Sequence, residues 1–306
     1  MKRYLLRRLL RAVTTIFSVV VFVFLMVRAV PGDPVDAILG EQASAEDRAL
    51  MRERLHLNDS LYEQFSAFAT DVANGSLGHS FRHERTVSDM LFEVALPTIV
   101  LALSALTLAL LIALPLGVLA AWRQGQIWDR LASTVGVFGL AIPNIWLGPM
   151  LILLFAVELR ILPLPGDESG LTLLLPTITL GTAMAAILTR QTRAATADAL
   201  ARPFAQAAKA RGLSPRKVLI HHGLRNALFP IVTIAGAQLG ALLSGTVVVE
   251  RIFERPGLGS LFLEAFFSRD LPVIQGVVLI VAFTYVIINL LLDLLYLAID
   301  PRVAIT

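Results

Sequence analysis

The sequence predicts an all-α protein that crosses a membrane six times. Of its 306 residues, 56% are hydrophobic and only 16% are charged, whereas a soluble domain has about 25% charged residues. The apolar residues gather in long blocks, and the lysines and arginines gather between alternate blocks. Long apolar blocks with basic residues on one side are typical of a polytopic membrane protein.

Each predicted span is long enough to cross the hydrocarbon core, which takes about 20 helical residues. The spans are residues 9–30, 96–121, 131–157, 171–190, 227–249 and 273–298. The fourth is the least apolar, with Pro176 and several Thr and Gly residues, which membrane helices tolerate when neighbours satisfy the backbone. The first follows a basic start but is too long for the core of a signal peptide, and no A-x-A site follows it. We therefore expect it to be retained.

The distribution of basic residues predicts that both termini are cytoplasmic. With this orientation the inner segments are strongly basic and the outer segments are acidic, as the positive-inside rule requires. The inner basic residues are Lys2, Arg3, Arg7, Arg8, Arg11, Arg123, Arg130, Arg190, Arg193, Arg202, Lys209, Arg211, Arg216, Lys217, Arg225 and Arg302. Because these charges lie at the membrane edges, the net charge of +3 does not indicate a nucleic-acid partner.

Two parts are expected along the chain. Residues 1–95 hold the first span and a helical insertion on the outer side, and residues 96–306 form a core of five spans with a cytoplasmic loop at 191–226. In the insertion, residues 44–70 have helical spacing, with Ser44 as the candidate N-cap. Asn74-Gly75 and Leu77-Gly78 then mark turns.

The sequence lacks the residues of several kinds of active site. It has no G-x-x-x-x-G-K-[ST] motif and therefore no P-loop for ATP, no H-E-x-x-H motif, and no cysteine for a thiol nucleophile or a disulfide. Its five histidines lie outside the predicted spans, which disfavours a membrane-embedded serine hydrolase. Adjacent His221-His222 is more simply a solvated pair than a metal site. We therefore predict a chain that is not an enzyme and holds no metal.

Ion coupling within the spans also has little support. Asp293 is the one carboxylate there, and pairing with a nearby arginine explains it more simply than a proton relay. A transport protein with neither an energy-binding site nor a coupling carboxylate must receive energy from a partner. A channel or secondary carrier that acts alone is the alternative.

The cytoplasmic loop contains a candidate docking element. Pro203 suits the first turn of a helix, Gly212 suits a helix stop, and Ser214-Pro215 starts a second helix that leads into the fifth span. The helix between Pro203 and Gly212 is short, alanine-rich and basic. Its small residues leave room for a partner surface, although a basic helix on the anionic inner leaflet has the same composition.

This segment resembles the EAA loop of ABC importer permeases, in which a short helix is followed by a glycine and a downstream run that ends in a proline. In that family the loop inserts into a cleft on the ATPase subunit. The resemblance assigns ATPase coupling to Phe204, Ala207, Ala208, Ala210, Arg211 and Gly212. The family's glutamate at the head of the motif is absent, since the aligned region reads Ala201-Arg202-Pro203-Phe204.

Further motifs cover nearly the whole chain. They are Tyr4-Leu5-Leu6-Arg7-Arg8-Leu9, Pro31-Gly32-Asp33-Pro34, Gly75-Ser76-Leu77-Gly78-His79-Ser80-Phe81, Leu96-Pro97-Thr98, Val249-Glu250-Arg251-Ile252-Phe253, Pro256-Gly257-Leu258-Gly259, Arg269-Asp270-Leu271-Pro272-Val273-Ile274-Gln275-Gly276 and Asp300-Pro301-Arg302. In this order they resemble the B-type permease subunit of dipeptide and oligopeptide (peptide/nickel) ABC importers, within the binding-protein-dependent transport system inner membrane component family. The resemblance implies the MetI-like fold of type I importers.

The resemblance also implies an assembly in the bacterial inner membrane. A second, homologous permease subunit would pair with this chain, two ATP-binding subunits would dock on the coupling loops, and a substrate-binding protein would deliver cargo. ATP and Mg²⁺ would be bound by the partner ATPases, and no cofactor by this chain. Di- or oligopeptides are the expected cargo, and nickel and glutathione are alternatives because those systems share the motifs.

Two further sets of residues are candidates for the transport path. Polar side chains within the spans are candidates for lining the transport path, although interhelical hydrogen bonding would also explain their presence. The candidates are Asn144, Gln238, Ser244 and Asn289. In the outer segment 250–272, a Pro256-Gly257 turn and many apolar side chains predict a short helix across the outer mouth, either a gate and binding-protein seat or a simple lid. The candidates there are Glu250, Phe253, Pro256, Gly257, Arg269 and Asp270.

Overall fold

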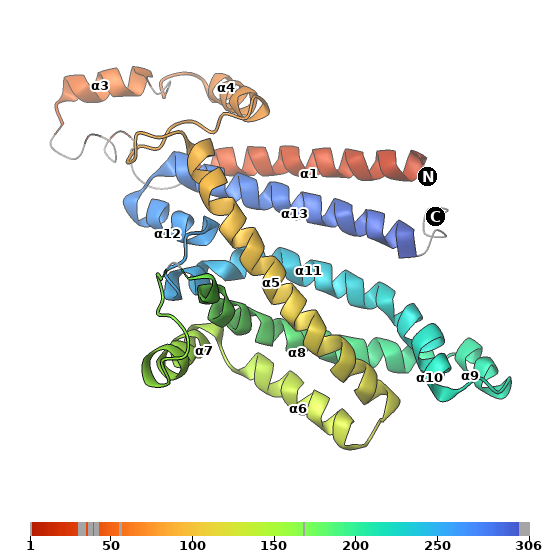
Figure 1. The fold of residues 1–306 in the computed structure, drawn as a ribbon. Helices are drawn as coiled ribbons and strands as arrows, with labels where there is room; N and C mark the ends of the chain where they lie inside the picture. Colours follow the sequence, from red (N-terminus) through yellow and green to blue (C-terminus); the bar gives the residue numbers. More distant parts are fainter. Residues whose placement is uncertain are drawn as a thin grey trace. The chain divides into compact units, whose positions relative to one another are not determined.

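The computed structural model describes residues 2–29, 35, 39, 43–54, 57–167 and 169–299. Every regular element among these residues is a helix (Figure 1). The chain divides into two compact units, one formed by Met1–Leu96 and Pro256–Leu290 and the other by Pro97–Arg255 and Leu291–Thr306. Two helices, α5 (Val87–Trp122) and α13 (Leu271–Ile299), contribute to both units.

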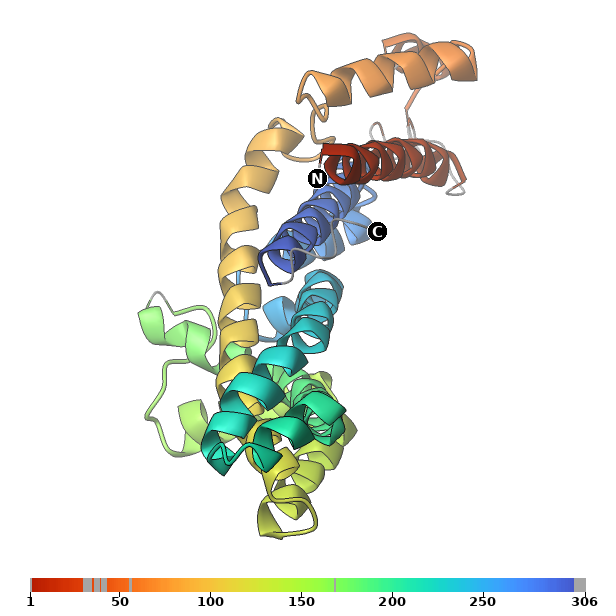
Figure 2. The same cartoon turned by 90° about the vertical axis from the view of Figure 1, so that its right-hand side faces the viewer.

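The first unit combines the N-terminal helices with residues 256–290. Besides the first part of α5 and most of α13, its helices are α1 (Lys2–Ala29), α3 (Ala45–Arg54), α4 (Leu61–Ala73) and α12 (Leu258–Ser268). Helices α1 and α13 lie side by side in both views (Figure 1, Figure 2), where Val20 and Val23 pack against Leu279. Helix α4 covers the same cluster with Phe65, whose ring centroid lies 5.2 Å from that of Phe24.

The insertion contains two separate helices where the apolar spacing predicted one helical stretch over residues 44–70. The predicted N-cap is confirmed, since the Asp47 amide donates to Ser44 Oγ at 3.1 Å. Helix α4 begins at a capping box in which Ser60 Oγ accepts from the Glu63 amide and the Glu63 carboxylate accepts from the Ser60 amide. This Ser-x-x-Glu pattern was the missed signal. The turns at Gly75 and Gly78 are confirmed by φ values of +78° and +81°.

The second unit is built around helix α8 (Leu174–Ala201). Its further elements are α6 (Ile127–Ala141), α7 (Asn144–Leu151), the π-helix η1 (Ile152–Glu158), the 3₁₀ turn η2 (Gly170–Leu173), α8 (Leu174–Ala201), α9 (Pro203–Ala210), α10 (Pro215–Lys217), the π-helix η3 (Val218–Leu224) and α11 (Arg225–Ile252). Helix α8 packs against α5, α6 and α11. A Cβ added at Gly117 of α5 would lie 2.6 Å from Thr192 Cβ, and one at Gly139 of α6 would lie 2.8 Å from Ala186 Cβ. Small residues therefore allow the close helix packing that membrane proteins use.

Among the described residues, five helices are long and apolar enough to cross a membrane, and a sixth span exists if α6 and α7–η1 are counted as one bent span. The expectation of one continuous helix over residues 131–157 is wrong, since the chain bends by 96° between these helices. Pro143 explains the bend. A residue that precedes proline is pushed out of the helical region, and Ile142 adopts φ −90° and ψ 112°.

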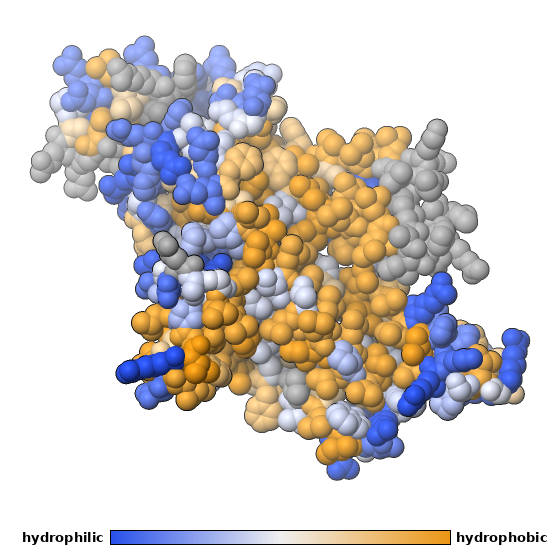
Figure 3. Space-filling model, in the orientation of Figure 1, coloured by the Kyte–Doolittle hydropathy of each residue, from blue (hydrophilic) through white to orange (hydrophobic). Residues whose placement is uncertain are grey.

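Much of the predicted cytoplasmic loop is helical. Helix α8 continues past the predicted span end to Ala201. From Pro215 onward, α10, η3 and α11 follow one another directly as one run of helical residues. The predicted start at Pro203 and stop at Gly212 are confirmed, because α9 begins at Pro203 and Gly212 has φ +82°. Figure 3 shows hydrophilic surface over α9 and α10 and hydrophobic surface along α5. The motifs Pro31–Pro34 and Asp300–Arg302 lie outside the described residues.

Candidate functional site

One face of helix α9 packs against the rest of the second unit. Ala205 is fully buried and Ala208 is 6% exposed. Both pack with Val218, at the start of η3, and with Leu200 and Leu213. A two-turn helix has little stability in isolation. These contacts therefore stabilise α9 and hold it between the end of α8 and the start of η3.

The opposite face of α9 is open. Among the residues assigned to coupling, five are exposed, namely Phe204, Ala207, Ala210, Arg211 and Gly212, whereas Ala208 is buried. The Phe204 ring is 39% exposed and lies 6.4 Å from the His222 ring. Sequence reasoning missed Ala205, although its three-residue spacing from Ala208 places both on one helical face. The open face therefore offers an aromatic ring, small side chains and a positive charge.

An ion pair joins α6 to α8 in the same unit. The Arg193 guanidinium donates from Nε to Asp129 Oδ1 and from Nη2 to Asp129 Oδ2, the second at 3.0 Å. Asp129 also accepts from the Gly125 amide at 2.8 Å. The pair fixes the first turn of α6 to a point about two turns before the end of α8.

Two candidate gate residues are internal to the second unit. Glu250 of α11 is 1% exposed and accepts a 2.6 Å hydrogen bond from Thr98 Oγ1 of α5. Phe253 is 3% exposed and belongs to the core, where a Cβ at Gly148 would lie 3.2 Å from its ring. Burial lowers the pKa of Arg255, just beyond α11, and the negative charge of Glu250 partly offsets this effect. Both Glu250 and Phe253 therefore stabilise the position of α11.

In the first unit, Asp270 joins two of the segments that carried the resemblance. Asp270 is 1% exposed and accepts from Ser80 Oγ at 2.5 Å and from the Phe81 amide at 3.2 Å. Close packing supports the same contact, because a Cβ at Gly276 would lie 2.5 Å from Val87 Cγ1. The motif at residues 75–81 is therefore held against the motif at residues 269–276.

The predicted short helix after Pro256-Gly257 is present as α12. Gly257 is its N-cap, and Arg269 ends it in the left-handed conformation with φ +56°. Its exposed surface includes two adjacent aromatic rings, Phe266 at 57% and Phe267 at 81% exposure. The position of α12 over a transport path stays a prediction.

The candidate path residues have different environments. Asn144, at the start of α7, and Gln238 of α11 are each half-buried. Asn289 is exposed, and its Nδ2 donates to Tyr285 O of its own helix at 2.8 Å. The side chain of Ser244 lies outside the described residues.

Two protein-family models match consecutive parts of the chain. The family described as binding-protein-dependent transport system inner membrane component matches residues 113–305. The N-terminal family of the same kind of membrane component matches residues 1–104. The chain belongs to this family. It is therefore an ABC transporter permease, a transport component and not an enzyme.

Curated relatives resemble the permease over almost its entire length. It is 40% identical over 303 residues to the glutathione transport system permease protein GsiC of Escherichia coli strain K12, a match that covers 99% of each chain. The protein of the same name in Shigella boydii serotype 4 is 39% identical with the same coverage. The predicted resemblance to the peptide/nickel group of ABC permeases is thus confirmed.

A solved structure confirms the fold. The inward-facing MetNI methionine ABC transporter matches with a TM-score of 0.57 and 22% identity, over 69% of this chain and 96% of that one. The permease therefore has the predicted MetI-like fold.

Proposed function

We propose that this permease forms one half of the translocation path of an ATP-driven importer and that α9 couples it to an ATPase subunit. Two ATP-binding subunits would bind ATP and Mg²⁺, a second homologous permease would complete the path, and a substrate-binding protein would deliver cargo. The membrane is the bacterial inner membrane, with both termini in the cytoplasm. The basic residues of the predicted inner segments support this orientation.

The two faces of α9 carry the proposal. The inner face, with Ala205 and Ala208, is buried against Val218, whereas the outer face exposes Phe204, Ala207 and Arg211. Because α9 is packed on one face and exposed on the other, a subunit docked on the exposed face can transmit its displacement through α9 to α8 and α11. Ala208 then acts as an anchor, and Phe204, Ala207, Ala210, Arg211 and Gly212 form the docking surface.

The candidate gate residues include buried residues that hold helices in position and residues at the ends of α12, a helix with an exposed surface. Glu250, Phe253 and Asp270 are buried, so we propose that they position the outer helices as the gate opens and closes. Pro256, Gly257 and Arg269 set the two ends of α12. Phe266 and Phe267 are the exposed aromatic side chains of α12 and can meet a binding protein. For the path we retain Asn144, Gln238, Ser244 and Asn289.

The proposed cargo is a small peptide. The relatives with 40% identity over the whole chain are named for glutathione transport, and glutathione is itself a tripeptide. We therefore place a glutathione-like peptide first, other di- and oligopeptides second and nickel third.

Cross-linking tests the docking surface. The chain has no cysteine, so Ala207→Cys introduces a single thiol on the open face of α9. It is expected to cross-link to a co-expressed ATPase subunit with a short bifunctional reagent. Ala67→Cys is the matched control, since Ala67 is an exposed alanine of α4. Equal ATPase cross-linking from both positions, or none from Ala207→Cys in a complex that hydrolyses ATP, would overturn the docking assignment.

Cargo is tested by ATP hydrolysis in the reconstituted complex with its binding protein. Stimulation by glutathione or by a dipeptide mixture would support the peptide assignment. Stimulation by a nickel chelate alone would replace it while leaving the importer function intact. Failure of any ATPase to assemble with the permease would contradict the importer function.

A further inference from the structure

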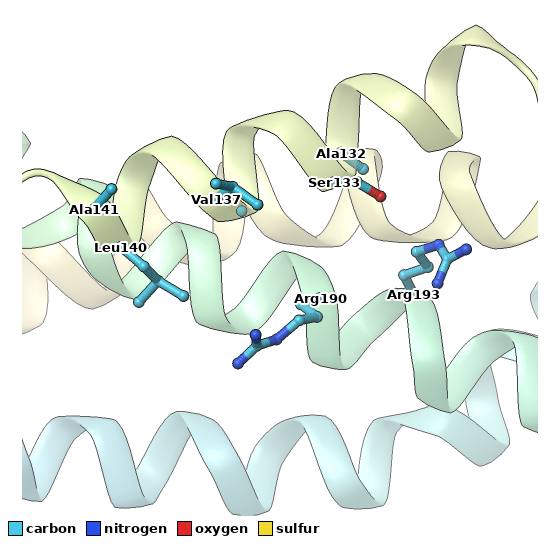
Figure 4. A pocket seen from close by; sticks show the side chains of 8 residues that line it. Ala132, Ser133, Val137, Leu140, Ala141, Arg190 and Arg193 are labelled. Carbon is cyan, nitrogen blue, oxygen red and sulfur yellow. The ribbon is translucent and has the colours of Figure 1, made fainter.

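An open groove of about 500 Å³ lies along α6 and α8 in the second unit (Figure 4). This volume falls within the usual range of small-ligand sites. Helix α6 supplies small and apolar side chains, and α8 supplies two arginines. The lining residues are Ala132, Ser133, Gly136, Val137, Leu140, Ala141, Arg190 and Arg193.

The two arginines differ in their partners. Arg193 is engaged by Asp129 through two nitrogen atoms. Arg190 is exposed and makes no hydrogen bond or ion pair with any residue in the part of the chain that the structure describes. The groove therefore contains one guanidinium whose five donors are available to a ligand.

The groove is polar at one end and apolar at the other. Figure 4 shows Arg193 beside Ser133 at one end and Leu140 and Ala141 at the other end of the α6 wall, with Arg190 of α8 between these ends. Close packing of Gly139 against Ala186 fixes the register of the two helices. The polar backbone of a peptide cargo would find few partners along Val137, Leu140 and Ala141, and burial of unpaired polar groups is costly. A ligand with an anionic head at Arg190 and an apolar tail along these side chains fits this lining.

We propose that this groove binds an anionic phospholipid of the cytoplasmic leaflet. The lipid phosphate accepts hydrogen bonds from Arg190, and an acyl chain lies against Val137 and Leu140. Guanidinium pairs with phosphate through strong, charge-assisted hydrogen bonds, and the cytoplasmic leaflet is the anionic one. The site goes beyond the importer function and uses the orientation proposed above.

A photoreactive phosphatidylglycerol with a diazirine in its acyl chain tests the site in membranes that contain the full-length permease and its co-expressed subunits. Cross-linked peptides are identified by mass spectrometry. Label is expected on residues 132–141, at a yield about tenfold lower in Arg190→Gln, the usual loss for one charge-assisted contact. Arg130→Gln is the matched control, because Arg130 is an exposed arginine of α6 that does not line the groove. It should keep the wild-type yield.

Several results would overturn the proposal. Equal labelling by a phosphatidylcholine probe would show that the groove does not select an anionic head. Equal loss in Arg130→Gln would indicate a diffuse surface charge effect. Suppression by free glycerol phosphate would indicate a site for a soluble anion. Absence of label on residues 132–141, with label elsewhere on the permease, would show that a protein segment covers the groove.

Discussion

Ser80 donates a 2.5 Å hydrogen bond to Asp270, a carboxylate that is 1% exposed and lies 190 residues further along the chain. The same carboxylate accepts from the Phe81 amide. One buried side chain thus holds together two segments that both carry the family resemblance. These two motifs therefore contact each other and support the first unit of the permease.

Replacement of Asp270 should therefore destabilise the first unit. Asp270→Ala leaves the Ser80 hydroxyl and the Phe81 amide without their acceptor, at a cost of roughly 1–3 kcal/mol. The thermal unfolding midpoint of the purified permease should fall. Asp71→Ala, at an exposed position of α4, is the control and should leave the midpoint unchanged. An equal midpoint for both variants would contradict the supporting role of Asp270.

The permease should tolerate a replacement of Thr98 only if the new side chain keeps the hydroxyl that donates to Glu250. Thr98→Val preserves the shape of the side chain but removes the donor to a carboxylate that is 1% exposed. We expect a stability loss of roughly 1–3 kcal/mol and reduced uptake. Thr98→Ser keeps the donor and should retain most of both. Wild-type stability in Thr98→Val would show that the bond does not support α11.

Substitution at Gly212 should act through the backbone. Its φ is +82°, and a Cβ there would meet nothing within 4 Å. A side chain in the left-handed region costs about 1–2 kcal/mol, and asparagine tolerates this region better than other residues. Gly212→Val should therefore lower cargo-stimulated ATP hydrolysis more than Gly212→Asn. Equal activity of the two variants would argue against a backbone requirement at this position.

The ion pair between Asp129 and Arg193 should show measurable coupling. Its side chains are 11% and 36% exposed, so solvent screens it only partly. A double-mutant cycle with Asp129→Asn and Arg193→Gln should give a coupling free energy of about 1 kcal/mol in thermal unfolding. Additive effects of the two substitutions would show that the pair contributes no net stability.

Local sequence signals predicted the features that depend on neighbouring residues. Ser44 caps α3, and Pro203 and Gly212 bound α9, because capping and the restricted φ of proline act within one helical turn. The spans were predicted because a membrane requires a fixed length of apolar helix. Pro143 shows the limit of this reasoning, since the apolar run conceals the bend that a proline causes.

The sequence by itself therefore determined the class of protein, the helices that enter the membrane and the boundaries of α9. Only the tertiary structure decided that Ala208 is buried, that Glu250 and Asp270 are internal, and that Arg193 is paired whereas Arg190 is exposed in a groove. The physical reason is the distance along the chain. A helix of known sequence can present any of its faces to a neighbour, and the contact that selects the face comes from a segment far away in the sequence.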